Sequence, residues 1–69
     1  MKTGRYYANL LKQYNNCGPA LTNDEANDLH SFLMELGEFF VANGDKIIAS
    51  GIYGSAHSIN NMLQARKLL

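Results

Sequence analysis

The chain has 69 residues, 46% of them hydrophobic, and six acidic side chains balance six basic ones. This length allows one domain, residues 1–69, and a chain this short buries only roughly 60% of its unfolded surface. The single cysteine, Cys17, excludes an intrachain disulfide and favours a reducing compartment. Because no apolar stretch reaches the length of a signal peptide or a membrane span, we expect a cytoplasmic protein.

The first predicted helix covers about residues 3–15. Its apolar positions recur at i, i+3, i+4 and i+7, which is one face of a helix, and they are Tyr7, Leu10, Leu11 and Tyr14. The asparagines, glycine and proline of residues 15–19 are then typical of a helix end.

The second predicted helix covers about residues 22–43 and has the clearest boundaries. Thr22 with Glu25 three residues later forms the pattern of a capping box. Gly44 suits the left-handed position that follows a helix. A wide apolar stripe lies between these ends, made of Leu29, Phe32, Leu33, Leu36, Phe39 and Phe40.

The third segment, residues 45–67, begins at Asp45, a good N-cap, and leaves two alternatives open. One is a continuous helix in which Gly51, Ser55 and Ser58 form a small-residue groove for a close helix crossing. The other is a turn at Tyr53-Gly54, followed by a new helix capped by Ser55. We favour the continuous helix, although each interior glycine costs about 1 kcal/mol relative to alanine unless another helix packs against it.

These elements predict an all-α fold, a small helical hairpin preceded by an N-terminal helix, in a three-helix domain completed by homo-oligomerisation. The second helix carries the argument for a second copy. Phe39 and Phe40 are adjacent, so they point about 100° apart around the helix. The apolar stripe is therefore wider than one neighbouring helix covers, and a dimer would cover it.

Charge is distributed unevenly along the chain. Residues 1–22 carry three bases and no acid, residues 23–45 carry six acids and no base, and residues 46–69 carry three bases and no acid. Opposite segments attract each other when they pack, within one chain or between two chains. No basic stripe is large enough to dominate a phosphate backbone, which argues against DNA as the partner.

The second alternative for the third segment predicts an anion site. If a helix began at Ser55, its free N–H groups and two serine hydroxyls would point at one spot, as at other anion-binding helix starts. The candidate ligand residues are Tyr53, Gly54, Ser55, His57 and Ser58 of one chain, with the basic Arg5, Lys12 or Arg66 of another. The competing interpretation is that these small residues only allow a close helix crossing.

Other chemistries have weaker support in the sequence. A helix-turn-helix in this region would place its first helix in the acidic segment, which phosphates repel. Cys17 could act as a nucleophile with His30 or His57 as its base, but nothing in the sequence brings them together. The same three residues have no standard metal-ligand spacing. We therefore expect no enzyme activity, no metal and no cofactor.

The leading functional hypothesis is a small non-catalytic interaction protein that acts as a homo-oligomer and binds and modulates another macromolecule, with a protein as partner. Small helical chains without catalytic motifs are common among phage proteins that inhibit host factors, which suggests one form of this function. The candidate interaction residues are Asp28, Phe32, Glu35, Phe39 and Phe40. The alternative is a protein that binds or sequesters an anionic small ligand, such as a nucleotide, at a subunit interface.

Overall fold

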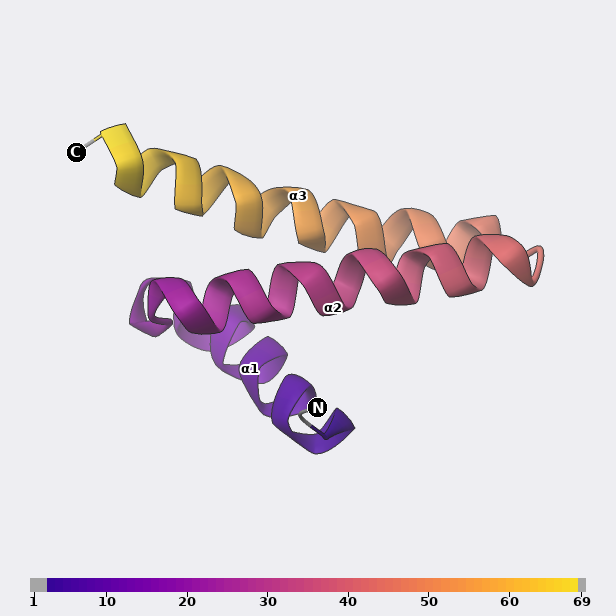
Figure 1. Cartoon of the computed structure of the whole chain (residues 1–69), viewed down its shortest axis with the longest axis horizontal. Coiled ribbons are helices and arrows are strands. Elements are labelled where there is room, and N and C mark those ends of the chain that lie inside the picture. The colour runs from indigo at the N-terminus through magenta and orange to yellow at the C-terminus, as the bar shows by residue number, and fades with distance from the viewer. Residues whose placement is uncertain (1–2, 69) are drawn as a thin grey trace.

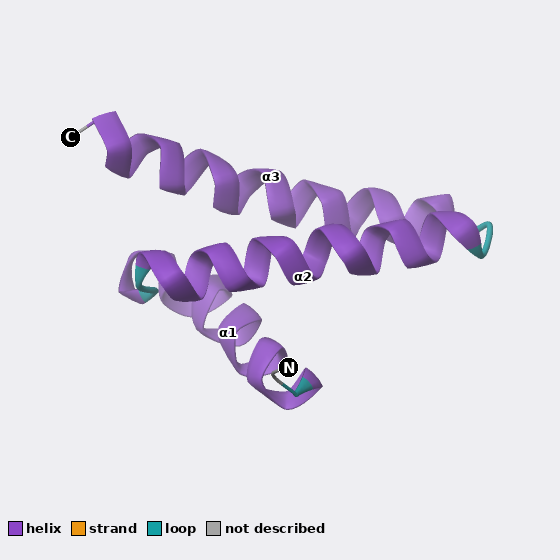
Figure 2. Ribbon diagram, in the orientation of Figure 1, coloured by secondary structure: helices purple, strands orange, loops and turns teal. Residues whose placement is uncertain are grey.

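The computed structural model describes residues 3–68 and is helical over almost all of that range. Its elements are α1 (Gly4–Cys17), the short 3-10 turn η1 (Gly18–Ala20), α2 (Asn23–Ala42) and α3 (Lys46–Leu68). Helices α2 and α3 form an antiparallel hairpin, and α1 crosses the first half of α2 at an angle (Figures 1 and 2). The predicted all-α, three-helix fold is confirmed, whereas its completion by a second copy stays a prediction.

Helix α1 runs two residues beyond the predicted end, as far as Cys17. Thr3 caps its start, where the hydroxyl accepts a hydrogen bond from the Tyr6 N–H at 3.3 Å. The asparagines in its last turn do not end it. Pro19 ends it, because proline has no N–H to donate, and the chain continues as the tighter turn η1.

The predicted ends of α2 are confirmed. The Thr22 hydroxyl accepts from the Glu25 N–H at 3.1 Å, and the Glu25 carboxylate accepts from the Thr22 N–H at 3.0 Å. At the other end Gly44 has a φ of 83°, a conformation that glycine adopts without a steric penalty. Asp45 then caps α3 by accepting from the Ile48 N–H at 3.2 Å. The hairpin loop is therefore only residues 43–45.

Helix α3 is continuous from Lys46 to Leu68, so the predicted alternative with a turn at Tyr53-Gly54 is wrong. The prediction that Gly51, Ser55 and Ser58 form a groove for a close helix crossing is wrong as well. Gly51 is exposed, and a Cβ atom added there would meet nothing within 4 Å. The small residues that α3 buries are Ala49 and Ala56, which are 1% and 0% exposed.

The close approach between α2 and α3 lies instead at Gly37, which the sequence analysis did not single out. A Cβ atom at Gly37 would lie 2.6 Å from Cε1 of Tyr53. Real Cβ atoms do not approach ring carbons so closely, so the absence of a side chain at Gly37 makes room for the tyrosine ring.

The main core lies where α1 crosses the hairpin. Its buried members are Leu10, Leu21, Ala26, Leu29, Leu33, Ala56, Ile59 and Leu63. Leu29 of α2 and Ile59 of α3 are the largest side chains that are completely buried. None of the helices within residues 3–68 is both long and apolar enough to cross a membrane.

Candidate functional site

The hairpin has two unlike ends (Figure 1). At the closed end, α1 packs as a third helix against the start of α2, and its Tyr14 reaches Ser58 in the middle of α3. At the open end, the last turns of α2, the loop and the first turns of α3 have no third helix beside them (Figure 2). The candidate functional surfaces differ between the closed end and the open end.

At the closed end, aromatic side chains of α1 contact several of the predicted site residues. Tyr7 stacks on Phe32 with ring centroids 4.2 Å apart and planes 4° from parallel. The Tyr6 hydroxyl donates to the Asp28 carboxylate at 3.1 Å. The hydroxyls of Tyr14 and Ser58 share a hydrogen bond. Phe32, Asp28 and Ser58 therefore have contacts within the chain, which reduces what each can offer to a partner or a ligand.

At the open end, large apolar side chains are left in solvent. Phe39 is 58% exposed, Ile47 is 88% exposed and Ile48 is 46% exposed. We call these three residues the open face. The Phe39 ring also lies edge-on to the neighbouring half-buried Phe40, with ring centroids 5.5 Å apart. Large exposed apolar side chains that gather at one end of a molecule mark an interaction surface more often than scattered ones do.

The open face continues the side of the hairpin that α1 covers at the closed end. Phe39 follows Phe32 by seven residues, about two helical turns, and Phe32 contacts Tyr7 of α1. Ile47 precedes Ser58 by eleven residues, about three turns, and Ser58 contacts Tyr14 of α1. The same side of α2 and α3 is thus covered at one end and bare at the other.

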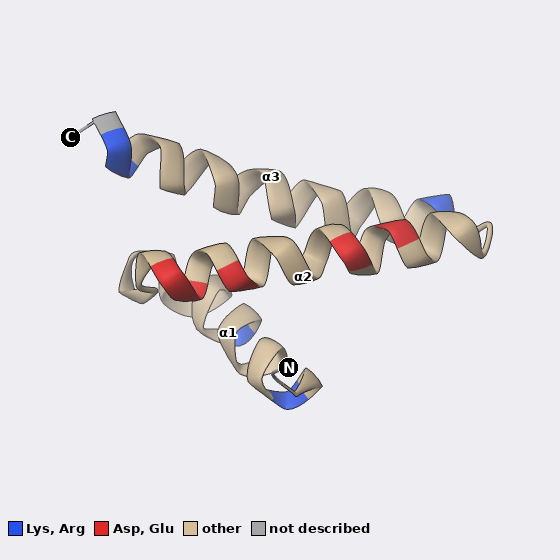
Figure 3. Ribbon diagram, in the orientation of Figure 1, with Lys and Arg blue, Asp and Glu red and all other residues tan. Residues whose placement is uncertain are grey.

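Acidic residues lie along α2, whereas basic residues lie on α1 and near the two ends of α3 (Figure 3). Glu35 and Glu38 are exposed in the turns beside Phe39. Two of the predicted interaction residues, Glu35 and Phe39, are therefore neighbours on the accessible surface. The basic Lys2, which contributes to the predicted charge pattern, lies outside the described residues.

The predicted ligand residues of α3 do not converge within one chain. The helix start that would have supplied free N–H groups at Ser55 does not exist, because α3 begins at Lys46. Tyr53 is half-buried against Gly37, and His57, one turn later, is exposed on the same side of the helix, whereas Ser58 contacts Tyr14 of α1. The premise of the predicted anion site is therefore wrong, as is the turn that a helix-turn-helix would require.

The three basic residues predicted for that site lie on other parts of the chain. Arg5 and Lys12 are exposed on α1. Arg66 donates from Nη1 to Oδ1 of Asn23 at 2.8 Å and from Nη2 to the carbonyl of Pro19 at 3.2 Å. Arg66 thus ties the end of α3 to the start of α2 in this chain, and only a second chain could add it to the segment at Tyr53–Ser58.

The residues considered for catalysis or metal binding lie on three different helices. Cys17 is exposed at the end of α1, His30 is half-buried on α2 and His57 is exposed on α3. Within residues 3–68, no group of three or more histidine, cysteine or acidic side chains is arranged to hold a metal ion.

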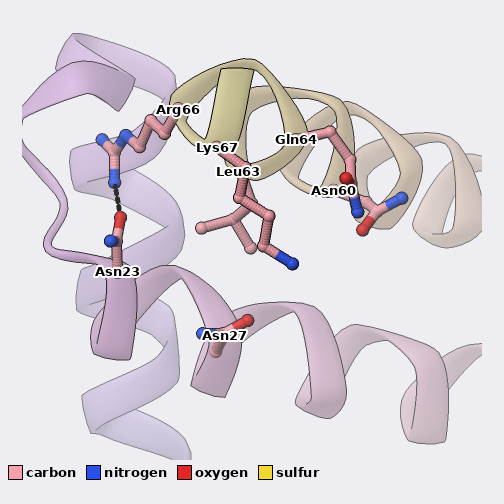
Figure 4. A pocket seen from close by; sticks show the side chains of 7 residues that line it. All are labelled: Asn23, Asn27, Asn60, Leu63, Gln64, Arg66 and Lys67. Atoms are coloured by element: carbon pink, nitrogen blue, oxygen red, sulfur yellow. Dashed lines mark hydrogen bonds between the residues drawn. The ribbon is translucent and has the colours of Figure 1, made fainter. Parts of the chain in front are cut away.

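A polar hollow of about 310 Å³ lies between the start of α2 and the end of α3. Its lining comprises Asn23, Asn27, Asn60, Leu63, Gln64, Arg66 and Lys67 (Figure 4). The sequence analysis missed this site apart from Arg66. Carboxamides from two helices carry no spacing pattern, and only the antiparallel packing of α2 and α3 brings them together.

Comparison with known proteins identified no relative: no family model, no curated protein and no solved structure matches the chain. The candidate functional surfaces of the chain are therefore the open face, the acidic side of α2 and the polar hollow.

Proposed function

We propose that this chain is a small non-catalytic interaction protein that self-associates through its open face and, as a homo-oligomer, binds and modulates another protein. The observation that carries the proposal is the exposure of Phe39, Ile47 and Ile48 together at one end of a two-helix hairpin. Fully burying an exposed side chain of this size stabilises a complex by about 1.5–3 kcal/mol, and the gain is smaller for Phe39 and Ile48, which are already partly buried. Three such side chains supply a driving force for association that a polar surface would lack.

The total surface area supports the same proposal. The accessible surface is 4859 Å² for a chain of 7.7 kDa. A folded monomer of this mass exposes roughly 4,300 Å² by the usual scaling of surface with mass. A single copy therefore leaves about a tenth more surface in solvent than a compact monomer would, in keeping with an elongated hairpin whose open end has no third helix beside it.

The acidic side of α2 supports the second part of the proposal. Glu35 and Glu38 remain exposed beside the apolar Phe39. A protein partner with basic side chains would match these carboxylates, because complementary charge steers association and selects partners. Inhibition of a host factor by a phage-type protein is one form that such modulation would take.

Native mass spectrometry over a range of protein concentrations tests the self-association. We expect a dimer or higher oligomer for the wild type and a monomer for Ile47→Glu, which places a charge on the open face. A glutamate in the first turn of α3 is compatible with the helix dipole, so the variant should still fold. Asn61→Glu is the matched control, because Asn61 is exposed on the same helix toward the closed end and precedes the last turn, where a glutamate would oppose the helix dipole. A wild-type monomer at every concentration would contradict the proposal.

A quantitative pull-down from the native host tests the partner. We expect a retained protein whose recovery falls in the double variant Glu35→Gln, Glu38→Gln, while the oligomeric mass stays unchanged. The control, Arg5→Gln with Lys12→Gln, removes two exposed charges from α1 and should leave the recovery unchanged. Equal losses in both double variants would show that the acidic side of α2 does not select the partner.

A further inference from the structure

The polar hollow at the closed end lies away from the open face and supports a separate conclusion. We propose that this hollow binds small phosphate monoesters, with the phosphate on Arg66 and Lys67 and the rest of the molecule against the carboxamides. Its volume of about 310 Å³ is at the small end of ligand pockets. The occupant is therefore a molecule of the size of a phosphorylated sugar or a nucleoside monophosphate.

The charges around the hollow select an anion. Arg66 and Lys67 both line it, and none of its lining residues is a carboxylate. Asp24 is exposed in the first turn of α2 but is not part of the lining. A phosphate monoester carries up to two negative charges near neutral pH, which two neighbouring cations can balance.

One of the two cations is already held in place. The guanidinium of Arg66 donates to Asn23 and to the carbonyl of Pro19, so its orientation is set before any ligand arrives. Nη2 also donates a weaker bond to Sδ of Met62, and the remaining ones of the five N–H donors are left for a phosphate oxygen. Lys67 is exposed, and its side chain extends from α3 toward α2 in Figure 4. The fixed arginine and the adaptable lysine thus both line the hollow, from adjacent positions on α3.

The carboxamides that line the hollow favour a ligand with a polar organic part in addition to its phosphate. Asn60 and Gln64 lie beside each other on α3, and Asn27 lies across the hollow on α2 (Figure 4). Each carboxamide both donates and accepts hydrogen bonds, which suits sugar hydroxyls and the edges of nucleobases. Inorganic phosphate alone would leave these carboxamides hydrogen-bonded to water. The ligand should therefore bind through both a phosphate and a polar organic part.

Titrations of the ¹⁵N-labelled protein followed by NMR test this proposal, with ribose 5-phosphate, adenosine monophosphate, inorganic phosphate and uncharged ribose as the probes. We expect saturable shifts of the Asn27, Asn60 and Gln64 side-chain amides with the two monoesters. Inorganic phosphate should need higher concentrations, and ribose should cause no saturable shift. The two monoesters distinguish a sugar phosphate from a nucleotide as the preferred occupant.

Two variants assign the interactions. Lys67→Gln should weaken binding of the monoesters about tenfold, because it removes a charge-assisted hydrogen bond. Lys46→Gln is the control, since it makes the same change on an exposed lysine at the opposite end of α3. Gln64→Leu should weaken the monoesters while leaving inorganic phosphate unchanged. Both changes are at exposed positions, so folding does not depend on them, as it would for Arg66.

Three outcomes would overturn the proposal. They are the absence of saturable shifts with every probe, equal affinity for inorganic phosphate and both monoesters, and monoester binding that Lys67→Gln leaves unchanged. None of them bears on self-association through the open face, since the two surfaces are at opposite ends of the hairpin.

Discussion

The closed and open ends of the hairpin are built from similar apolar residues and end up with different surroundings. Leu29 and Ile59 at the closed end are 0% exposed, whereas Ile47 at the open end is 88% exposed. The cause is the length and direction of α1. Its 14 residues span about 21 Å, whereas the molecule is 39 Å long, and α1 also crosses the hairpin at an angle.

One amphipathic stripe therefore has two roles in this protein, packing within the chain and, in the proposed oligomer, contact with another chain. The stripe of α2 continues from Phe32, which stacks on Tyr7, to Phe39, which is exposed. The first position stabilises the chain itself, and the second is available to another chain. Substitutions at the two ends should therefore change different measured quantities.

The largest effect is expected for a cavity in the closed-end core. Leu29→Ala removes a completely buried side chain and should lower the free energy of unfolding by about 3 kcal/mol. Phe39→Ala at the open end should change the unfolding free energy of the monomer by less than about 1 kcal/mol, because its ring is largely exposed. Urea unfolding at a concentration where the protein is monomeric measures both. Equal losses would contradict the distinction between the two ends.

The next largest effect on the free energy of unfolding is expected for substitutions of Gly37 and Gly51. Gly37→Ala should destabilise the chain by about 1–2 kcal/mol, because the new Cβ would collide with the Tyr53 ring. Gly51→Ala should stabilise it by about 1 kcal/mol, since alanine favours the helix and the site is open. Thermal and urea unfolding of both variants test this opposition. A stabilised Gly37→Ala protein would mean that the ring moves aside at little cost.

A smaller effect is expected at the helix caps of the two ends. Thr22→Ala breaks one of the two hydrogen bonds of the capping box and should cost about 1 kcal/mol. Asp45→Ala breaks the single cap of α3 at the open end and should cost no more than that. Hydrogen exchange in the first turn of each helix locates the loss. Faster exchange should be confined to the helix whose cap was removed.

The smallest effect is expected for the hydrogen bond between α1 and α3. Tyr14→Phe removes the hydroxyl that meets Ser58 and should cost about 0.5 kcal/mol, since the bond is exposed to water. Ser58→Ala should cost about the same, and the double variant should cost no more than either single one. Additive losses would show that the two hydroxyls act independently.

The sequence by itself determined the local structure of this protein. The helices were predicted from the spacing of apolar residues over two or three turns, and the capping box at Thr22 and Glu25, the left-handed Gly44 and the cap at Asp45 from single residues or pairs three positions apart. Interactions over so short a distance depend on the type and spacing of the side chains alone. The prediction failed locally only at the end of α1, where the asparagines did not stop the helix before Pro19.

The tertiary structure alone decided the surroundings of each helix. Tyr53 packs against Gly37, and Gly51 is exposed to solvent. Helix α1 does not extend far enough to cover the open face. The tertiary structure also joined carboxamides from α2 and α3 around the polar hollow. These features depend on which residues distant in the chain come to lie together, and on how far one helix reaches along another. The periodicity of a single helix shows which side is apolar but carries no information on what covers it.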